Sequence, residues 1–199
     1  MLEYSSLFSI EATCLNGYRN SMVIKQQKNI TFILFYVCAM IIALTPKCAY
    51  SLDTQEQVKS VFLYNFTNFV AWPAALNTVQ VCIYGDEKIT GILGFIASQM
   101  ETSQINIKVR EMHAPKVHQK CNVAYIGKKK ESRLKEFLKS VEGKNILSVS
   151  DIEDFAKKGG IIGFVTRYNK IKLQINPSTA QKSSLKISSR LLKLAEIIK

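Results

Sequence analysis

The sequence predicts a single α/β domain in which a mixed β-sheet of about five to six strands is flanked by helices. From residue 55 onward, segments with helical spacing of apolar residues alternate with short segments typical of strands. Two of the later strands are expected to form a β-hairpin around Tyr168-Asn169, because Asn tolerates the positive φ that tight hairpins need. A hairpin makes at least one strand pair antiparallel, and no repeat or long linker divides the pattern.

The first helix is expected to begin near Gln55 and to end before Pro73, which disfavours helical geometry in the preceding residue. Asp53 and Thr54 are suitable capping residues, and Gln57 completes a capping-box pattern with Thr54. The residues that recur at helical spacing and form the expected inward stripe are Val58, Val61, Phe62, Asn65, Phe69 and Trp72.

Strands and helices then follow in order along the chain. Strands are expected at 79–85, 104–112, 121–127 and 145–149, with helices at 89–100 and 132–141. A short helix is expected from Asp151 to Ala156, before the break at Gly159-Gly160. The strands of the C-terminal β-hairpin, at 161–167 and 171–175, come next, and a C-terminal helix closes the domain. The final helix is expected from about Ser188, with an inner face of Ile187, Leu191, Leu194 and Ile198.

Residues 22–51 have the pattern of a secretory signal peptide. Lys25 and Lys28 precede an apolar run at 30–44, and Ala49 and Ser51 are the small residues of a cleavage site near Ser51. The run is short for a transmembrane helix, which needs about 20 apolar residues, and an uncleaved anchor is the alternative. Residues 1–21 are expected to be an upstream over-extension, and residues 52–199 the exported domain.

The exported segment is long enough, at 148 residues, to bury a sizeable core. It carries 23 Lys and Arg against 13 Asp and Glu, a net charge of +10. An exported protein encounters little nucleic acid, so we expect no nucleic-acid partner; an anionic membrane surface or an acidic protein fits the charge better. Lys128, Lys129 and Lys130 are either a docking patch for such a partner or a solvated loop.

Only Cys82 and Cys121 of the five cysteines lie in the exported segment. In an oxidising compartment they are expected to form one disulfide, and two buried free thiols are the alternative. The disulfide would close a loop of 39 residue steps and contribute about 4 kcal/mol in the chain-entropy model.

The sequence contains no CxxC, GxSxG, P-loop or GxGxxG motif. His113 and His118, with Glu111 nearby, make at most a weak metal site, and a solvated loop is the simpler interpretation. Three carboxylates that suggest a catalytic pair also suit a helix N-terminus: Asp151, Glu153 and Asp154. We therefore expect no catalysis, cofactor or bound metal.

Six segments in order resemble the YfiR-like family of periplasmic proteins. They are VKSVFLYNFTNF at 58–69 followed by Trp72-Pro73, CIYGD at 82–86, CNVAYI at 121–126, GGIIGFV at 159–165, INP at 175–177 and ISSRLLKLA at 187–195. The resemblance covers nearly all of the exported segment. Some family members carry a second cysteine pair towards the C-terminal half, which this chain lacks, so redox control through that pair does not carry over.

The resemblance implies a non-catalytic periplasmic regulator that binds and represses an inner-membrane sensor. In the best-known case the sensor is a diguanylate cyclase, so the regulator controls cyclic-di-GMP signalling and biofilm formation, and an outer-membrane lipoprotein relieves the repression. Many relatives accompany other membrane sensors, so a periplasmic small-ligand-binding module of another sensor system is the alternative.

Candidate partner-binding residues fall into three groups: Tyr64, Asn65, Phe66 and Trp72; Lys128, Lys129 and Lys130; and Arg190. The aromatic residues of the first group exceed what one narrow stripe can bury, so part of them is expected to face a partner or a second subunit of a homodimer. The alternative is a helix buried on several sides. Asn65 in the inward stripe and Arg190 at the edge of the last helix are either structural or recognition residues.

Overall fold

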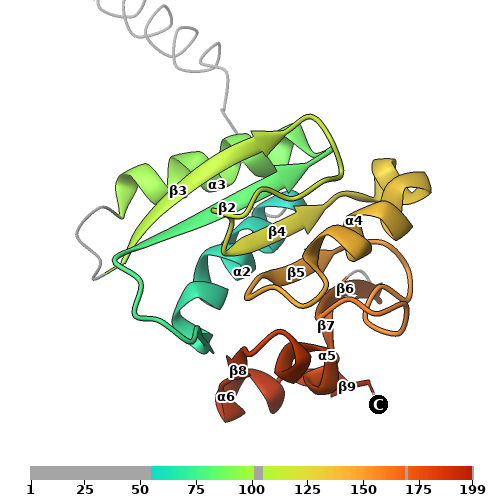
Figure 1. Cartoon of the computed structure of the whole chain (residues 1–199). Coiled ribbons are helices and arrows are strands. Elements are labelled where there is room, and N and C mark those ends of the chain that lie inside the picture. Colours follow the sequence, from blue (N-terminus) through green and yellow to red (C-terminus); the bar gives the residue numbers. More distant parts are fainter. Residues whose placement is uncertain (1–54, 101–104, 169, 199) are drawn as a thin grey trace, which may run out of the picture. The chain divides into compact units, whose positions relative to one another are not determined.

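The computed structural model describes residues 55–100, 105–168 and 170–198. In this part of the chain, seven strands form one mixed sheet in the order β3-β2-β4-β5-β6-β7-β9, flanked by helices (Figure 1). The strands are β2 (Thr78–Tyr84), β3 (Asn106–Met112), β4 (Val123–Ile126), β5 (Leu147–Ser150), β6 (Ile162–Arg167), β7 (Lys170–Ile175) and β9 (Ala195–Ile197). The predicted α/β class with a mixed sheet is therefore confirmed.

Every neighbouring pair in this sheet is parallel except β6 and β7, which form the predicted hairpin. Tyr168 in its turn has φ 51° and is fully exposed. The strand order reverses between β2 and β4, because the chain places β3 on one side of β2 and returns to place β4 on the other. In open parallel sheets, ligands bind at the carboxyl ends of the strands near such a reversal.

Helices cover both faces of the sheet. The helical elements are α2 (Gln55–Phe69), α3 (Glu87–Gln99), η1 (Lys128–Arg133), α4 (Leu134–Val141), α5 (Pro177–Lys182) and α6 (Ser189–Leu192). Because side chains alternate along a strand, β2 presents Val79, Val81 and Ile83 to the core that includes residues of α2 and α3. Its Cys82 and Tyr84 belong to the separate core that contains α4 residues.

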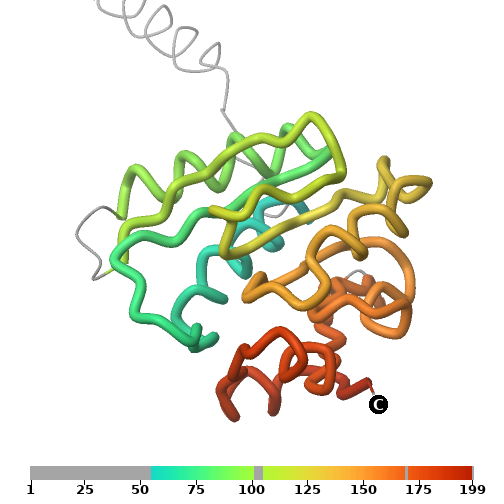
Figure 2. Tube along the Cα trace, in the orientation of Figure 1, coloured from blue at the N-terminus to red at the C-terminus, as the bar shows by residue number. Residues whose placement is uncertain are grey.

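A short ribbon ties the C-terminal segment to the end of α2. Figure 2 shows residues 177–198 folding back beside this helix, where β1 (Val70–Ala71) pairs antiparallel with β8 (Lys186–Ile187). The next residue, Ser188, donates its backbone N–H to the Phe69 carbonyl at 2.9 Å. The end of α2 and the C-terminal segment are therefore hydrogen-bonded to each other.

The structure corrects two predicted helices. Residues 151–159 contain turns in place of the expected helix from Asp151 to Ala156, and Asp154 adopts φ 55°, which a right-handed helix cannot accommodate. The predicted final helix is the single turn α6, after which Ala195–Ile197 join the sheet as β9, parallel to β7. Leu194 is accordingly 70% exposed instead of lying on an inner helix face.

The inward face of α2 is also rotated relative to the prediction. Its buried residues are Lys59, Ser60, Leu63, Tyr64, Phe66 and Thr67, whereas Val61 is 48% exposed. The helix is covered on several sides: it contacts α3, and Phe66 stacks on Phe164 of β6 with ring centroids 6.0 Å apart. The alternative of a helix buried on several sides is thus the correct one.

The expected over-extension, signal peptide and capping residues, at 1–21, 22–51 and 53–54, lie outside the described residues. Among the helices that the structure describes, none is both long and apolar enough to cross a bilayer.

Candidate functional site

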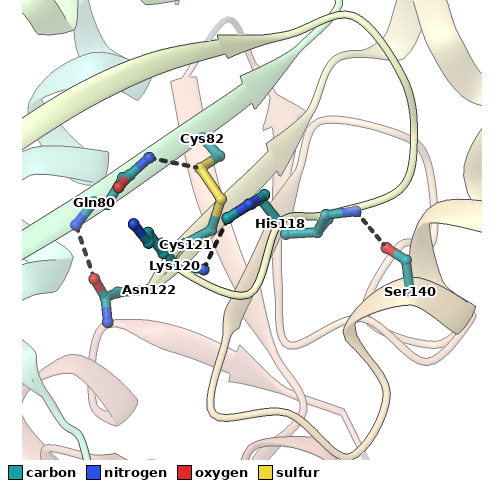
Figure 3. Close-up of a disulfide and its surroundings, with 8 residues drawn as sticks. Gln80, Cys82, His118, Lys120, Cys121, Asn122 and Ser140 are labelled. Atoms are coloured by element: carbon teal, nitrogen blue, oxygen red, sulfur yellow. Dashed lines mark hydrogen bonds between the residues drawn. A yellow bond between two sulfur atoms is a disulfide. The ribbon is translucent and has the colours of Figure 1, made fainter.

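The predicted disulfide joins Cys82 of β2 to Cys121, two residues before β4, with the Cα atoms 5.9 Å apart (Figure 3). Both cysteines are buried. Next to the bridge, Asn122 Oδ1 accepts the Gln80 N–H at 2.8 Å, and Gln80 O accepts the Asn122 N–H at 2.9 Å. The bridge and these bonds attach the start of β4 to β2.

Two hydrogen bonds from backbone N–H groups to side chains hold the loop that contains His113 and His118. The Lys120 N–H donates to His118 Nδ1 at 3.2 Å, and the Val117 N–H donates to Ser140 Oγ of α4 at 3.0 Å (Figure 3). His113 is exposed. Within the described residues, no group of three or more His, Cys, Asp or Glu side chains is arranged to hold a metal ion.

Two of the candidate aromatic residues cannot form a partner surface in this structure. Tyr64 is 9% exposed and Phe66 is fully buried, so their assignment to such a surface is wrong. Trp72 follows β1, is half-buried and lines a cavity of about 410 Å³ near the disulfide with Cys121 and Asn122. Its Nε1 is buried and has no hydrogen-bond partner among the described residues. Trp72 therefore remains the accessible aromatic candidate.

Asn65 and Arg190 both lie nearer the surface than the sequence suggested. The Asn65 Nδ2 group donates to the Val61 carbonyl of its own helix at 2.9 Å, so it satisfies its amide locally. Arg190 in α6 is exposed, and the described residues give its side chain no ion pair. Within the described part of the chain, no side-chain hydrogen bond or ion pair of either residue links two elements of the fold.

Lys128, Lys129 and Lys130 are exposed in η1, which follows the carboxyl end of β4. The Lys130 ammonium lies 5.5 Å from the centre of the Tyr84 ring, and its side chain packs against Gly85, where a Cβ would come within 2.2 Å of Lys130 Cγ. Lys130 is therefore held against β2, whereas Lys128 and Lys129 are the more available charges.

A nearly buried ion pair between Lys59 and Asp151 is a contact that the sequence did not predict. Lys59 Nζ of α2 donates to Asp151 Oδ2 at 2.7 Å, and the two side chains are only 8% and 15% exposed. Asp151 directly follows β5, and its Oδ1 accepts the Lys128 N–H at 2.8 Å. One carboxylate thus connects α2, the end of β5 and the first residue of η1. A lysine on the side of an apolar helix and an aspartate ending a buried strand were the available signals.

Tyr125 of β4 lies near this ion pair. The whole of Tyr125 is buried, and its hydroxyl has no hydrogen-bond partner among the described residues. Burial, followed by the negative charge of Asp151, raises the pKa of the Tyr125 phenol above its usual range. The phenol therefore stays neutral and is no candidate for a base.

A cavity of about 450 Å³ opens beside Lys59 and Asp151 at the carboxyl ends of β5 and β6. Gln174 of β7 also lines it and is 3% exposed. Its Nε2 donates to Glu196 Oε2 at 3.2 Å, while its Oε1 has no partner among the described residues. Both charge signs occur around this cavity, so the arrangement suits a polar ligand.

A family model described as YfiR/HmsC-like matches residues 56–196. A solved structure of a conserved domain protein from Vibrio cholerae O1 biovar El Tor is similar in fold, with a TM-score of 0.53, 11% identity, and coverage of 73% of this chain and 60% of that chain. So is an ABC domain from Streptococcus pneumoniae in complex with L-Trp, with a TM-score of 0.50, 12% identity, and coverage of 72% and 60%. The chain spans about 60% of each neighbour, and at these identities the likeness concerns the fold alone.

Proposed function

Since the chain belongs to the YfiR/HmsC-like family, we propose that it is a non-catalytic periplasmic regulator that binds and represses an inner-membrane sensor protein. The sensor is a diguanylate cyclase in this proposal, so the chain lowers cyclic-di-GMP and restrains biofilm formation. An outer-membrane lipoprotein that relieves the repression is a further proposed partner, and a homodimer is the proposed form of the regulator.

The family match over residues 56–196 carries this proposal, because it spans almost the whole described domain. The buried disulfide supports export, since disulfides persist in oxidising compartments such as the periplasm. The signal-peptide pattern at 22–51 points to the same compartment. The regulatory character of the family supports a role without catalysis.

Deletion of the gene and complementation test the function. We expect cyclic-di-GMP to rise in the deletion strain, to fall when the full chain is restored, and to stay high when residues 52–199 are supplied behind a start Met without the signal segment. The last strain controls for location, because it makes the same domain inside the cell. Unchanged cyclic-di-GMP after deletion would refute repression of a diguanylate cyclase.

The alternative is a small-ligand-binding module of another membrane sensor system. The cavity beside Lys59 and Asp151 supports it, because it lies at the carboxyl ends of β5 and β6 and is lined by side chains of both charge signs. The Streptococcus pneumoniae neighbour was solved in complex with L-Trp, which makes amino acids the first ligands to test. Saturable thermal stabilisation by an amino acid, lost in Gln174→Leu, would favour this alternative; its absence for all twenty would count against amino-acid ligands.

A further inference from the structure

The two faces of the sheet are covered unequally. Helices α2 and α3, with 15 and 13 residues, contribute to one core, whereas α4, with 8 residues, is the main helix of the other (Figure 1). An open groove of about 670 Å³ lies between α4 and α5, with Ser148 of β5 and Gly159 also lining it. This groove is separate from the cavity beside Lys59 and Asp151.

The floor of the groove is apolar and recessed. Leu134, Leu138 and Val141 follow one another at helical spacing along α4, so they lie on one side of that helix. Leu134 and Val141 are 8% and 6% exposed, and Leu138 is half-buried. The floor can therefore receive apolar side chains from another molecule but does not project any of its own.

The rim of the groove is basic. Its charged residues are Lys135, Lys139, Lys158 and Lys182 against a single carboxylate, Glu142. Lys158 contacts Glu131 at 3.5 Å, while the described residues give no ion pair to the other three lysines. These three lysines are exposed, so their charges are available to a partner.

We propose that the groove between α4 and α5 is a docking surface for an acidic amphipathic segment of a protein partner. Such a segment would place apolar side chains on the recessed floor and its carboxylates beside the lysines, as in helix-in-groove recognition. Charge complementarity of this kind steers association and selects the partner. Resting on the proposed function, the segment belongs to the membrane sensor.

A protein segment fits the groove better than a membrane surface. A membrane-binding face combines basic residues with apolar side chains that project into the lipid. Here Leu134 and Val141 are buried below the level of the lysines. Binding to anionic lipid is therefore the competing outcome that the experiment must separate.

The groove variant is Lys135→Glu/Lys139→Glu/Lys182→Glu in the full chain. Its matched control, Lys108→Glu/Lys116→Glu/Lys120→Glu, makes the same charge change at exposed lysines outside the groove. Both variants should melt within a few degrees of the wild type, because exposed substitutions usually change stability by less than about 0.5 kcal/mol. In the deletion strain, we expect the control variant to restore low cyclic-di-GMP and the groove variant to fail.

A cross-linking experiment reports on the groove without relying on cyclic-di-GMP. The photoreactive residue p-benzoylphenylalanine replaces Leu138 in the wild-type, groove and control chains, and the cross-linked peptides are identified by mass spectrometry from intact cells. We expect one membrane-protein segment rich in Asp and Glu, with the yield reduced at least about tenfold in the groove variant and unchanged in the control. Vesicles of phosphatidylglycerol and phosphatidylethanolamine at a 1:3 ratio should bind the groove and control variants equally, because both carry the same change of charge.

Several results would overturn the docking proposal: equal cross-linking by the groove and control variants, a cross-linked segment without acidic residues, or vesicle binding that the groove variant loses and the control variant keeps. Loss of both readouts in Lys128→Glu/Lys129→Glu, with the groove variant unaffected, would place the surface at η1 instead. If deletion leaves cyclic-di-GMP unchanged while the acidic cross-link forms as expected, the groove stands and the proposed function fails. If deletion raises cyclic-di-GMP and the groove variant represses fully, only the groove fails.

Discussion

Replacing Lys59 with Met is expected to destabilise the protein strongly, because Lys59 lies on the buried side of α2. The substitution removes the ammonium group that contacts Asp151 at 2.7 Å and leaves a carboxylate that is only 15% exposed. Removing one partner of a buried ion pair typically costs about 3–5 kcal/mol, because the remaining charge is buried without compensation. We expect about 3 kcal/mol here, since Asp151 keeps the hydrogen bond from the Lys128 N–H and some contact with solvent.

The double variant Lys59→Met/Asp151→Leu separates the loss of the pair from the cost of a stranded carboxylate. Replacing both members of a buried ion pair with apolar side chains is often close to neutral. The double variant should therefore be more stable than Lys59→Met alone. Lys157→Met is the matched control, because Lys157 contacts Asp154 at 2.8 Å while both side chains are about half exposed. Exposed ion pairs contribute little, so its effect should be small.

Urea unfolding of residues 52–199 measures these differences, provided that the dependence of the unfolding free energy on urea stays constant among variants. A loss of about 3 kcal/mol corresponds to a decrease in melting temperature of roughly 6–12 °C for a chain of this size. If Lys59→Met and Lys157→Met unfold at the same urea concentration, the burial argument for the Lys59–Asp151 pair is refuted.

Three further predictions concern the core and the surface. The variant Cys82→Ala/Cys121→Ala should lose about 4 kcal/mol of unfolding free energy. In the wild-type protein, thiol labelling under denaturing, non-reducing conditions should find neither cysteine free, and labelling of both would contradict the disulfide. Gly160→Ala should destabilise the protein by about 1–3 kcal/mol, because a Cβ would come within 2.1 Å of the buried Phe155 ring. Gly91→Ala in α3 should instead stabilise the protein by about 0.5–1 kcal/mol, because a Cβ at Gly91 would meet open space and Ala favours a helix. Equal melting temperatures of the two variants would refute the packing argument. Asn65→Ala and Arg190→Ala should each stay within about 0.5 kcal/mol of the wild type in thermal unfolding, and a loss above 1 kcal/mol would reveal a structural contact.

The six strands from β2 to β7 were the more predictable part of this fold. The hairpin at 162–175 and strand β2 follow directly from local apolar patterns and a turn that accepts positive φ. The failures have a non-local origin. Residues 195–197 form β9 because β7 offers them a free edge, which no local periodicity encodes, and the aspartate-rich segment after β5 turns at Asp154 instead of forming a helix.

The candidate site was less predictable than the fold, because its polar contacts join distant segments. Lys59 and Asp151 are 92 residues apart, and only the completed sheet brings the end of β5 to α2. The disulfide was predictable because residues 52–199 contain just two cysteines. Tyr64 and Phe66 were assigned wrongly because a single stripe was assumed for a helix that is covered on several sides.

The burial of α2 changes where a partner surface should be sought. This helix is the aromatic-rich segment of the chain, yet Phe66 packs on Phe164 and Tyr64 belongs to the core, so these rings stabilise the domain itself. A partner that binds the described surface must then use other features. The groove beside α4 offers a recessed apolar floor and unpaired lysines within the described part of the chain, which together provide both burial and charge selection. A partner surface built on charge predicts association that weakens as salt rises, whereas binding through the aromatic residues of α2 would depend little on salt.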